Sequence, residues 1–109
     1  MTVYNPNCWV VLQMTHRDGV IYKVLGGWDG SYLNGDSWRL NSGIVKAEYD
    51  SSDGLWKFYG SSGSVYNCSP TTYGLRMSTY HIYQTMVSTY PNKIKLMEQQ
   101  NWEKMDWTK

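Results

Sequence analysis

Short β-type segments separated by glycine-containing turns constrain the fold of this chain more than any other feature of its sequence. Residues 9–16 and 20–25 are rich in Trp, Val, Leu and Ile, and the turn Arg17-Asp18-Gly19 lies between them. Glycine can take the positive φ that such a turn requires, so the two segments predict a β-hairpin.

Further strands follow this hairpin. Val45, Ala47 and Tyr49 alternate with polar residues, which predicts a strand with these three side chains on one face. Residues 55–59 and 64–68 come after turns rich in Ser, Asp and Gly. The three segments predict a meander of hairpins.

One segment has the features of a helix. Residues 78–90 begin with Ser78, a suitable N-cap, and Pro91 ends the segment. Its apolar stripe consists of Ile82, Tyr83, Met86 and Tyr90. Residues 93–98 alternate again and predict a last strand. We therefore expect an α+β fold: a small antiparallel sheet of about five to six strands, packed against one main α-helix, with a final strand after the helix.

A chain of 109 residues is long enough to form one domain without metals or disulfides. We expect a single domain over residues 1–98 and a polar tail over residues 99–109. Exposed tryptophans in such a tail would be unfavourable. Trp102 and Trp107 are therefore expected to dock either on the domain itself or on a second subunit of a homo-oligomer.

The charge balance limits the classes of partner. Ten basic and nine acidic residues give a formal net charge of +1, without the basic excess typical of proteins that bind long nucleic acids. No apolar run approaches the roughly 18 residues that cross a bilayer, and residues 1–7 lack a signal-peptide pattern. These features predict a cytoplasmic protein without a membrane partner. Cys8 and Cys68 are then expected as free thiols, although one disulfide between them is the alternative.

No motif for catalysis or metal binding stands out. Cys8, Cys68, His16 and His81 could ligate a metal, but they lack the paired spacing of known metal sites. A nucleophilic cysteine would need a base and a group that orients this base, and no such signature surrounds Cys68. The sequence therefore predicts no catalytic residue, no metal and no cofactor.

The aromatic residues carry the strongest functional signal. Ten Tyr and six Trp stand against a single Phe. Phe can fill a core, whereas Tyr and Trp are favoured where one side of the ring packs against apolar groups and the other contacts water, as at binding surfaces. This composition predicts a binding domain.

Two segments concentrate the candidate ligand-binding residues. Residues 28–43 contain aromatic side chains and Arg39, whose guanidinium is planar and positively charged. The aromatic faces suit a base or a sugar, and the guanidinium can pair with a phosphate or stack on a ring. Residues 60–64 form a Gly/Ser turn, flanked by Tyr59 and Tyr66, whose backbone N–H groups and hydroxyls could bind an anion. The candidates are Trp28, Tyr32, Trp38, Arg39, Tyr59, Ser61, Ser62, Ser64 and Tyr66, with Arg76 close enough in sequence to approach the turn. As alternatives, the Gly/Ser turn is a plain hairpin turn, and Trp28 and Trp38 close the end of the sheet.

Three functions fit these features. The first is a non-enzymatic domain that sequesters a small nucleotide-type ligand through Tyr/Trp stacking and Ser/Arg contacts. The second is an inhibitor that binds a host defence protein through an aromatic hot spot. The third is a carbohydrate-binding module. The chain resembles small phage-encoded accessory proteins in its size, its high Tyr, Trp, Met and Asn content and its lack of a catalytic motif. A protein of this kind would have a counter-defence role in the host cytoplasm.

Overall fold

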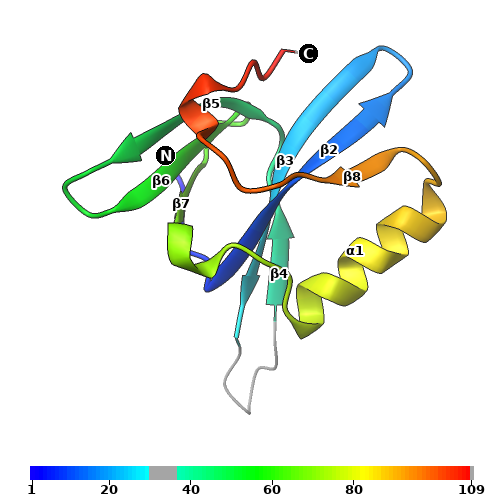
Figure 1. Cartoon of the computed structure of the whole chain (residues 1–109), viewed down its shortest axis with the longest axis horizontal. Coiled ribbons are helices and arrows are strands. Elements are labelled where there is room, and N and C mark those ends of the chain that lie inside the picture. Colours follow the sequence, from blue (N-terminus) through cyan, green and yellow to red (C-terminus); the bar gives the residue numbers. More distant parts are fainter. Residues whose placement is uncertain (30–36, 109) are drawn as a thin grey trace.

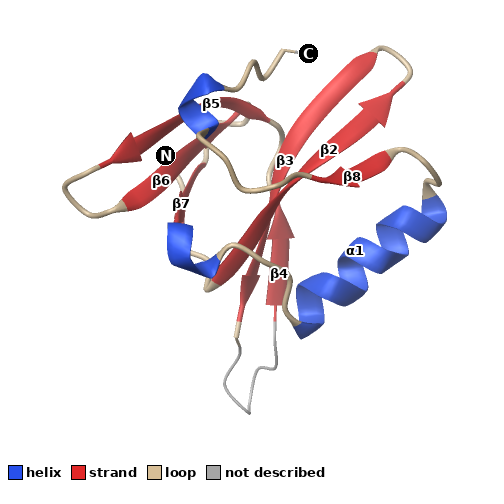
Figure 2. Ribbon diagram, in the orientation of Figure 1, coloured by secondary structure: helices blue, strands red, loops and turns tan. Residues whose placement is uncertain are grey.

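The computed structural model describes residues 1–29 and 37–108. Their helices and strands are shown in Figures 1 and 2. In chain order they are β1 (Val3–Tyr4), β2 (Cys8–His16), β3 (Gly19–Trp28), β4 (Ser37–Leu40), β5 (Ile44–Asp50), β6 (Leu55–Gly60), β7 (Val65–Cys68), the 3₁₀ helix η1 (Pro70–Thr72), α1 (Met77–Thr89), β8 (Ile94–Leu96) and the 3₁₀ helix η2 (Trp102–Lys104).

The described strands form two sheets of four. One sheet has the order β4-β3-β2-β8, and the other has the order β1-β7-β6-β5. Neighbouring strands are antiparallel except for β1, which pairs in parallel with β7. The α+β class, the single main helix and the strand after it are confirmed, whereas the strands divide into two small sheets where the sequence indicated one.

The predicted hairpin is the longest paired unit of the fold. β2 and β3 pair from Cys8 opposite Gly27 to His16 opposite Gly19. Gly19 closes the turn with a φ of 140°, a conformation that side-chain-bearing residues rarely adopt. β4 and β8 then extend this hairpin at its two edges.

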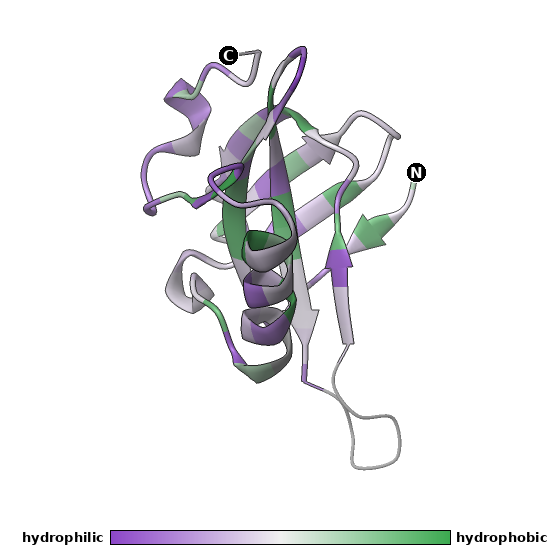
Figure 3. Cartoon of the chain, turned by 90° about the vertical axis from the view of Figure 1, so that its right-hand side faces the viewer, coloured by the Kyte–Doolittle hydropathy of each residue, from purple (hydrophilic) through white to green (hydrophobic). Residues whose placement is uncertain are grey.

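The sheet that contains this hairpin separates two packing layers. On one face, Val10, Leu12 and Leu25 contact α1 through side chains that include Ile82 and Met86. The other face packs against the second sheet. Figure 1 shows α1 on one side of β2 and β3 and the strands β5–β7 on the other, and Figure 3 shows α1 lying in front of its sheet. Strict alternation along β2 produces this arrangement, because successive residues face opposite layers.

The prediction for β5 was wrong in its register. A bulge between Ile44 and Lys46 interrupts the alternation, so that Val45 is 59% exposed while Ile44 and Ala47 are buried. A bulge adds one residue to one strand of a pair and therefore reverses which side chains face inward beyond it. Beyond the bulge, Ala47 and Tyr49 share a face as predicted, and Tyr49 lies opposite Trp56 but is 43% exposed near the end of the strand.

The residues after β8 complete the core between the two sheets. Trp102 is fully buried, with its ring centroid 6.1 Å from that of Trp9, 6.0 Å from that of Phe58 and 6.1 Å from that of Trp107. Together with Tyr73, whose ring lies 5.9 Å from that of Trp102, these residues are called the core cluster below. Residues 102–107 therefore pack as part of the domain.

Candidate functional site

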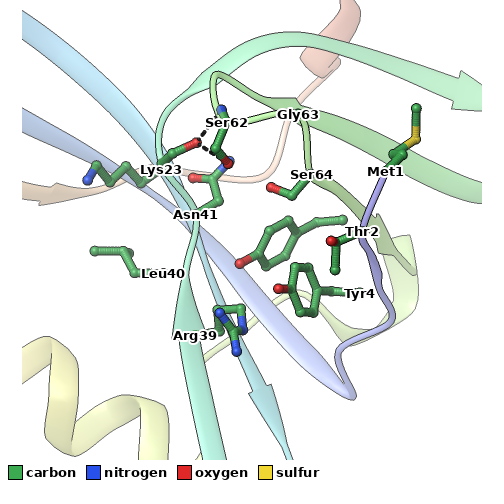
Figure 4. Close-up of a pocket in the computed structure, with 12 residues that line it drawn as sticks. Met1, Thr2, Tyr4, Lys23, Arg39, Leu40, Asn41, Ser62, Gly63 and Ser64 are labelled. Atoms are coloured by element: carbon green, nitrogen blue, oxygen red, sulfur yellow. Dashed lines mark hydrogen bonds between the residues drawn. The ribbon is translucent and has the colours of Figure 1, made fainter.

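A concave site lies where the N-terminal strand, the residues after β4 and the β6–β7 turn meet (Figure 4). It has a volume of about 620 Å³. We call it the main pocket. Its lining residues are Met1, Thr2, Tyr4, Lys23, Arg39, Leu40, Asn41, Ser42, Ser62, Gly63, Ser64 and Tyr66.

The two loops that the sequence singled out join at this pocket. The Ser62 N–H donates to Ser42 Oγ at 3.0 Å, and the two hydroxyls lie 3.1 Å apart. The neighbouring Ser61 N–H donates to the Gly43 carbonyl at 2.9 Å. Gly43 has a φ of 140°, so the chain can turn there in a way that a side chain would oppose. Residues about twenty positions apart in sequence thus form one wall.

Asn41 lies at the base of this wall and is 3% exposed. Its Oδ1 accepts a hydrogen bond from the Val24 N–H at 2.8 Å, which fixes the orientation of the amide group. Its Nδ2 is buried and has no hydrogen-bond partner among the described residues. A buried donor without a partner costs about 1–3 kcal/mol. An acceptor on a bound molecule would remove this cost.

Gly60 lies beside the same amide group. A Cβ on Gly60 would lie 3.0 Å from Ser64 Oγ, 3.1 Å from Ser42 Oγ and 3.5 Å from Asn41 Nδ2. Two hydroxyls and one amide therefore gather closely around this glycine. Hydroxyl and amide groups can all donate hydrogen bonds.

Cations are present at the pocket and acids are absent from its described lining. Lys23 and Arg39 line it, and no Asp or Glu does. The Arg39 guanidinium lies 4.6 Å from the centroid of the Tyr4 ring, within the range of a cation–π contact. Figure 4 shows Tyr4 and Arg39 next to each other at one end of the pocket, with Ser62 and Asn41 toward the other. This distribution favours an anionic ligand.

Tyr66 forms part of the aromatic side of the pocket. Its ring lies 4.9 Å from that of Tyr4. Burial raises the pKa of Tyr66 to about 12, while the charge of Arg39 lowers it slightly. The phenol is therefore neutral at physiological pH and keeps its proton as a hydrogen-bond donor.

A smaller pocket of about 240 Å³ adjoins the main pocket. We call it the side pocket. Tyr4 and Arg39 line both pockets and so form their common wall. The other lining residues of the side pocket are Trp28, Ser37 and Trp38. The ring of Trp28 meets that of Tyr4 edge-on at 6.2 Å, and Trp38 is 47% exposed.

Six of the sequence candidates line one of these two pockets. Arg39, Ser62, Ser64 and Tyr66 line the main pocket, and Arg39 also lines the side pocket with Trp28 and Trp38. Tyr32 lies outside the described residues.

The remaining three candidates line neither pocket. Tyr59 donates a hydrogen bond to Glu48, because it points away from the core-facing side of β6 that holds Phe58. This bond raises the pKa of Tyr59. Ser61 is exposed on the turn. Arg76 forms an exposed ion pair with Asp29 at 2.6 Å.

Sequence reasoning missed four important lining residues: Tyr4, Lys23, Asn41 and Ser42. Ser42 precedes Gly43 in the sequence, and a Ser-Gly pair is a turn signal that sequence reasoning could have used. Tyr4 belongs to β1, a two-residue strand that pairs in parallel with β7. Nothing in the local sequence pattern indicates this pairing.

The structure places the thiols and histidines away from this site. Cys8 and Cys68 are free and buried. Burial raises the pKa of both thiols, that of Cys68 by more, which is the opposite of what a reactive thiolate needs. No cluster of three or more His, Cys, Asp or Glu side chains suited to a metal ion occurs within residues 1–29 and 37–108.

None of the helices in the described part of the chain has the length and apolar character that crossing a membrane requires.

Comparison of this chain with protein-family models, curated proteins and solved structures gave no match.

Proposed function

We propose that this protein is a non-enzymatic binding domain that holds a small anionic ligand of nucleotide type in the main pocket. The observation that carries the proposal is the buried, unpartnered Nδ2 of Asn41 in a pocket lined by two cations and by no acid in its described part. A ligand acceptor at this amide would gain a hydrogen bond and relieve an existing cost.

The remaining lining residues suit the same ligand. The hydroxyls of Ser62 and Ser64 add donors near the amide, and Arg39 and Lys23 neutralise phosphate charge. The half-buried ring of Tyr4 provides an apolar surface for a base. His, Cys, Asp and Glu are all missing from the described lining, which supports recognition rather than acid–base or nucleophilic chemistry.

The first experiment measures binding of a panel of 5′-mononucleotides, nucleosides and inorganic phosphate by calorimetry and by thermal shift. A ligand present at one hundred times its Kd should stabilise the protein by about 2.7 kcal/mol. We expect mononucleotides to bind more tightly than nucleosides or phosphate alone, because the pocket combines cations with aromatic rings. The absence of any shift at millimolar nucleotide would overturn the proposal.

A matched pair of arginine variants tests the site itself. Arg39→Ala removes the cation at the pocket, and Arg17→Ala removes an exposed cation of the β2–β3 turn that lies outside it. Both change the net charge equally. We expect Arg39→Ala to weaken mononucleotide binding by about tenfold or more and Arg17→Ala to leave it unchanged. Equal losses in both variants would mean that only the overall charge matters.

The Asn41→Asp variant isolates the unpartnered donor. Aspartate keeps the oxygen that accepts from the Val24 N–H, but it replaces Nδ2 by a second oxygen. We expect a folded protein, checked by its NMR spectrum, that no longer binds an anion. Unchanged binding by this folded variant would show that the amide does not contact the ligand.

A further inference from the structure

The main pocket and the side pocket share a wall, and this arrangement has a consequence for the size of the ligand. Tyr4 and Arg39 line both pockets, whose volumes are about 620 and 240 Å³. A molecule that contacts Arg39 from the main pocket therefore has the side pocket next to it.

The pairing of β3 with β4 places three lining residues of the side pocket on one face. Arg39 lies opposite Gly26, and Trp28 lies opposite Ser37. Because directly opposed residues project to the same face of a sheet, Arg39, Trp28 and Ser37 share one face. Gly26 lies between them without a side chain, and the buried Pro6 packs there, 3.0 Å from where a Cβ would lie.

The chemistry changes along this face in the order that a dinucleotide requires. The main pocket contains hydrogen-bond donors and the ring of Tyr4. The shared wall holds the Arg39 guanidinium, 4.6 Å from the centroid of the same ring. The side pocket contains the indole of Trp28 and the hydroxyl of Ser37. A guanidinium between two aromatic sites suits a phosphate that links two bases.

We propose that the ligand is a dinucleotide, with its first nucleotide in the main pocket, its linking phosphate at Arg39 and its second base against Trp28 in the side pocket. This inference rests on the proposed function. The low net charge of +1 agrees with a ligand of this size rather than a long strand.

The test compares the four 5′-mononucleotides with the four homodinucleotides of the form 5′-pNpN, by calorimetry at one salt concentration. We expect the best dinucleotide to bind about tenfold more tightly than its mononucleotide, the contribution of about one stacked base. Trp28→Leu should remove this advantage, because it should weaken dinucleotide binding by more than it weakens mononucleotide binding.

Trp107→Leu is the matched control, because Trp107 is also partly buried but belongs to the core cluster and lines neither pocket. We expect it to keep the dinucleotide advantage. Thermal unfolding of both variants verifies that each is folded at the assay temperature. Trp28→Phe, which retains a ring, should restore most of the advantage if Trp28→Leu proves too unstable to assay.

The outcomes separate the inference from the proposed function. Mononucleotide binding without a dinucleotide advantage, or an equal loss of both in Trp28→Leu, overturns the dinucleotide and leaves the proposed function in place. An affinity that continues to rise for tri- and tetranucleotides also overturns it, since that indicates a strand channel. Binding of no nucleotide overturns both proposals.

Discussion

The core cluster and the main pocket each contain one buried donor without a partner, and the two differ in what surrounds it. Trp102 Nε1 and Asn41 Nδ2 are the two buried side-chain atoms in this state among the described residues. Trp102 is enclosed by rings that include Trp9 and Phe58, so the burial of a large indole outweighs one lost hydrogen bond. Asn41 buries little apolar surface, and its amide borders an open pocket.

This difference shows how to interpret an unsatisfied polar atom. In the core cluster it is a cost that packing offsets, whereas in the main pocket we propose that a ligand atom offsets it. The same contrast applies to the Tyr and Trp residues in general. Those of the core cluster pack on one another, and those of the pockets lie beside cations.

The largest expected effect belongs to the core cluster. Trp102→Ala should lower the free energy of unfolding by about 3–5 kcal/mol, because it removes a fully buried ring and leaves a cavity. Urea denaturation measures this change. Trp107→Ala, at a partly buried position of the same cluster, should cost less. A loss below about 1 kcal/mol for Trp102→Ala would mean that residues 102–107 are not part of the core.

A pair of tyrosine variants sharpens the comparison at the level of single hydroxyls. The Tyr73 hydroxyl accepts from the Val11 N–H at 3.1 Å and donates to the Met97 carbonyl, so Tyr73→Phe should cost about 1–3 kcal/mol in unfolding free energy. The Tyr66 hydroxyl makes no hydrogen bond with the described residues, and Tyr66→Phe should change stability by less than about 0.5 kcal/mol. Equal losses in urea denaturation would contradict the distinction between core and pocket.

Alkaline pH provides a test of how closed the pocket is around Tyr66. Burial raises the pKa of Tyr66 and of Tyr73 to about 12, whereas a tyrosine in the unfolded chain titrates near pH 10. The unfolded state therefore loses these protons first, and the free energy of unfolding should fall as pH rises from about 10 to 12. The absorbance of phenolate in each Tyr→Phe variant assigns the titrations. Titration of Tyr66 near pH 10 would show that water reaches its hydroxyl freely.

The smallest effect is expected at Arg76. This residue pairs with Asp29 on the surface, and exposed ion pairs contribute about 1 kcal/mol or less. Arg76→Ala should therefore change thermal stability only slightly and should leave nucleotide binding intact, in contrast to Arg39→Ala. A loss of binding would extend the site toward the start of α1.

Local patterns were sufficient for the longest hairpin and the main helix. The Arg17-Asp18-Gly19 turn predicted the β2–β3 hairpin, and Pro91 correctly limited the helix. The helix begins at Met77, with Arg76 as its N-cap. The division into two sheets was not accessible, because it depends on which strands pair over long distances. The β5 bulge was missed for a related reason, since alternation rules assume an unbroken register.

The candidate site could be predicted only in part from the sequence. Glycine and serine turns pointed to Ser62 and Ser64, and an aromatic segment pointed to Arg39. Asn41 gave no signal, because its importance comes from a hydrogen bond to Val24 in another strand and from the lack of a second one. Such a property exists only once the strands have assembled.

The position of Trp102 after β8 has a consequence for how the protein is made. A ribosome delivers β1 to β8 and α1 before Trp102 emerges, and until then the rings of Trp9 and Phe58 lack the indole that packs against both. The nascent chain therefore exposes this apolar surface until residue 102 has been made, and exposed apolar surface draws chaperones and promotes aggregation.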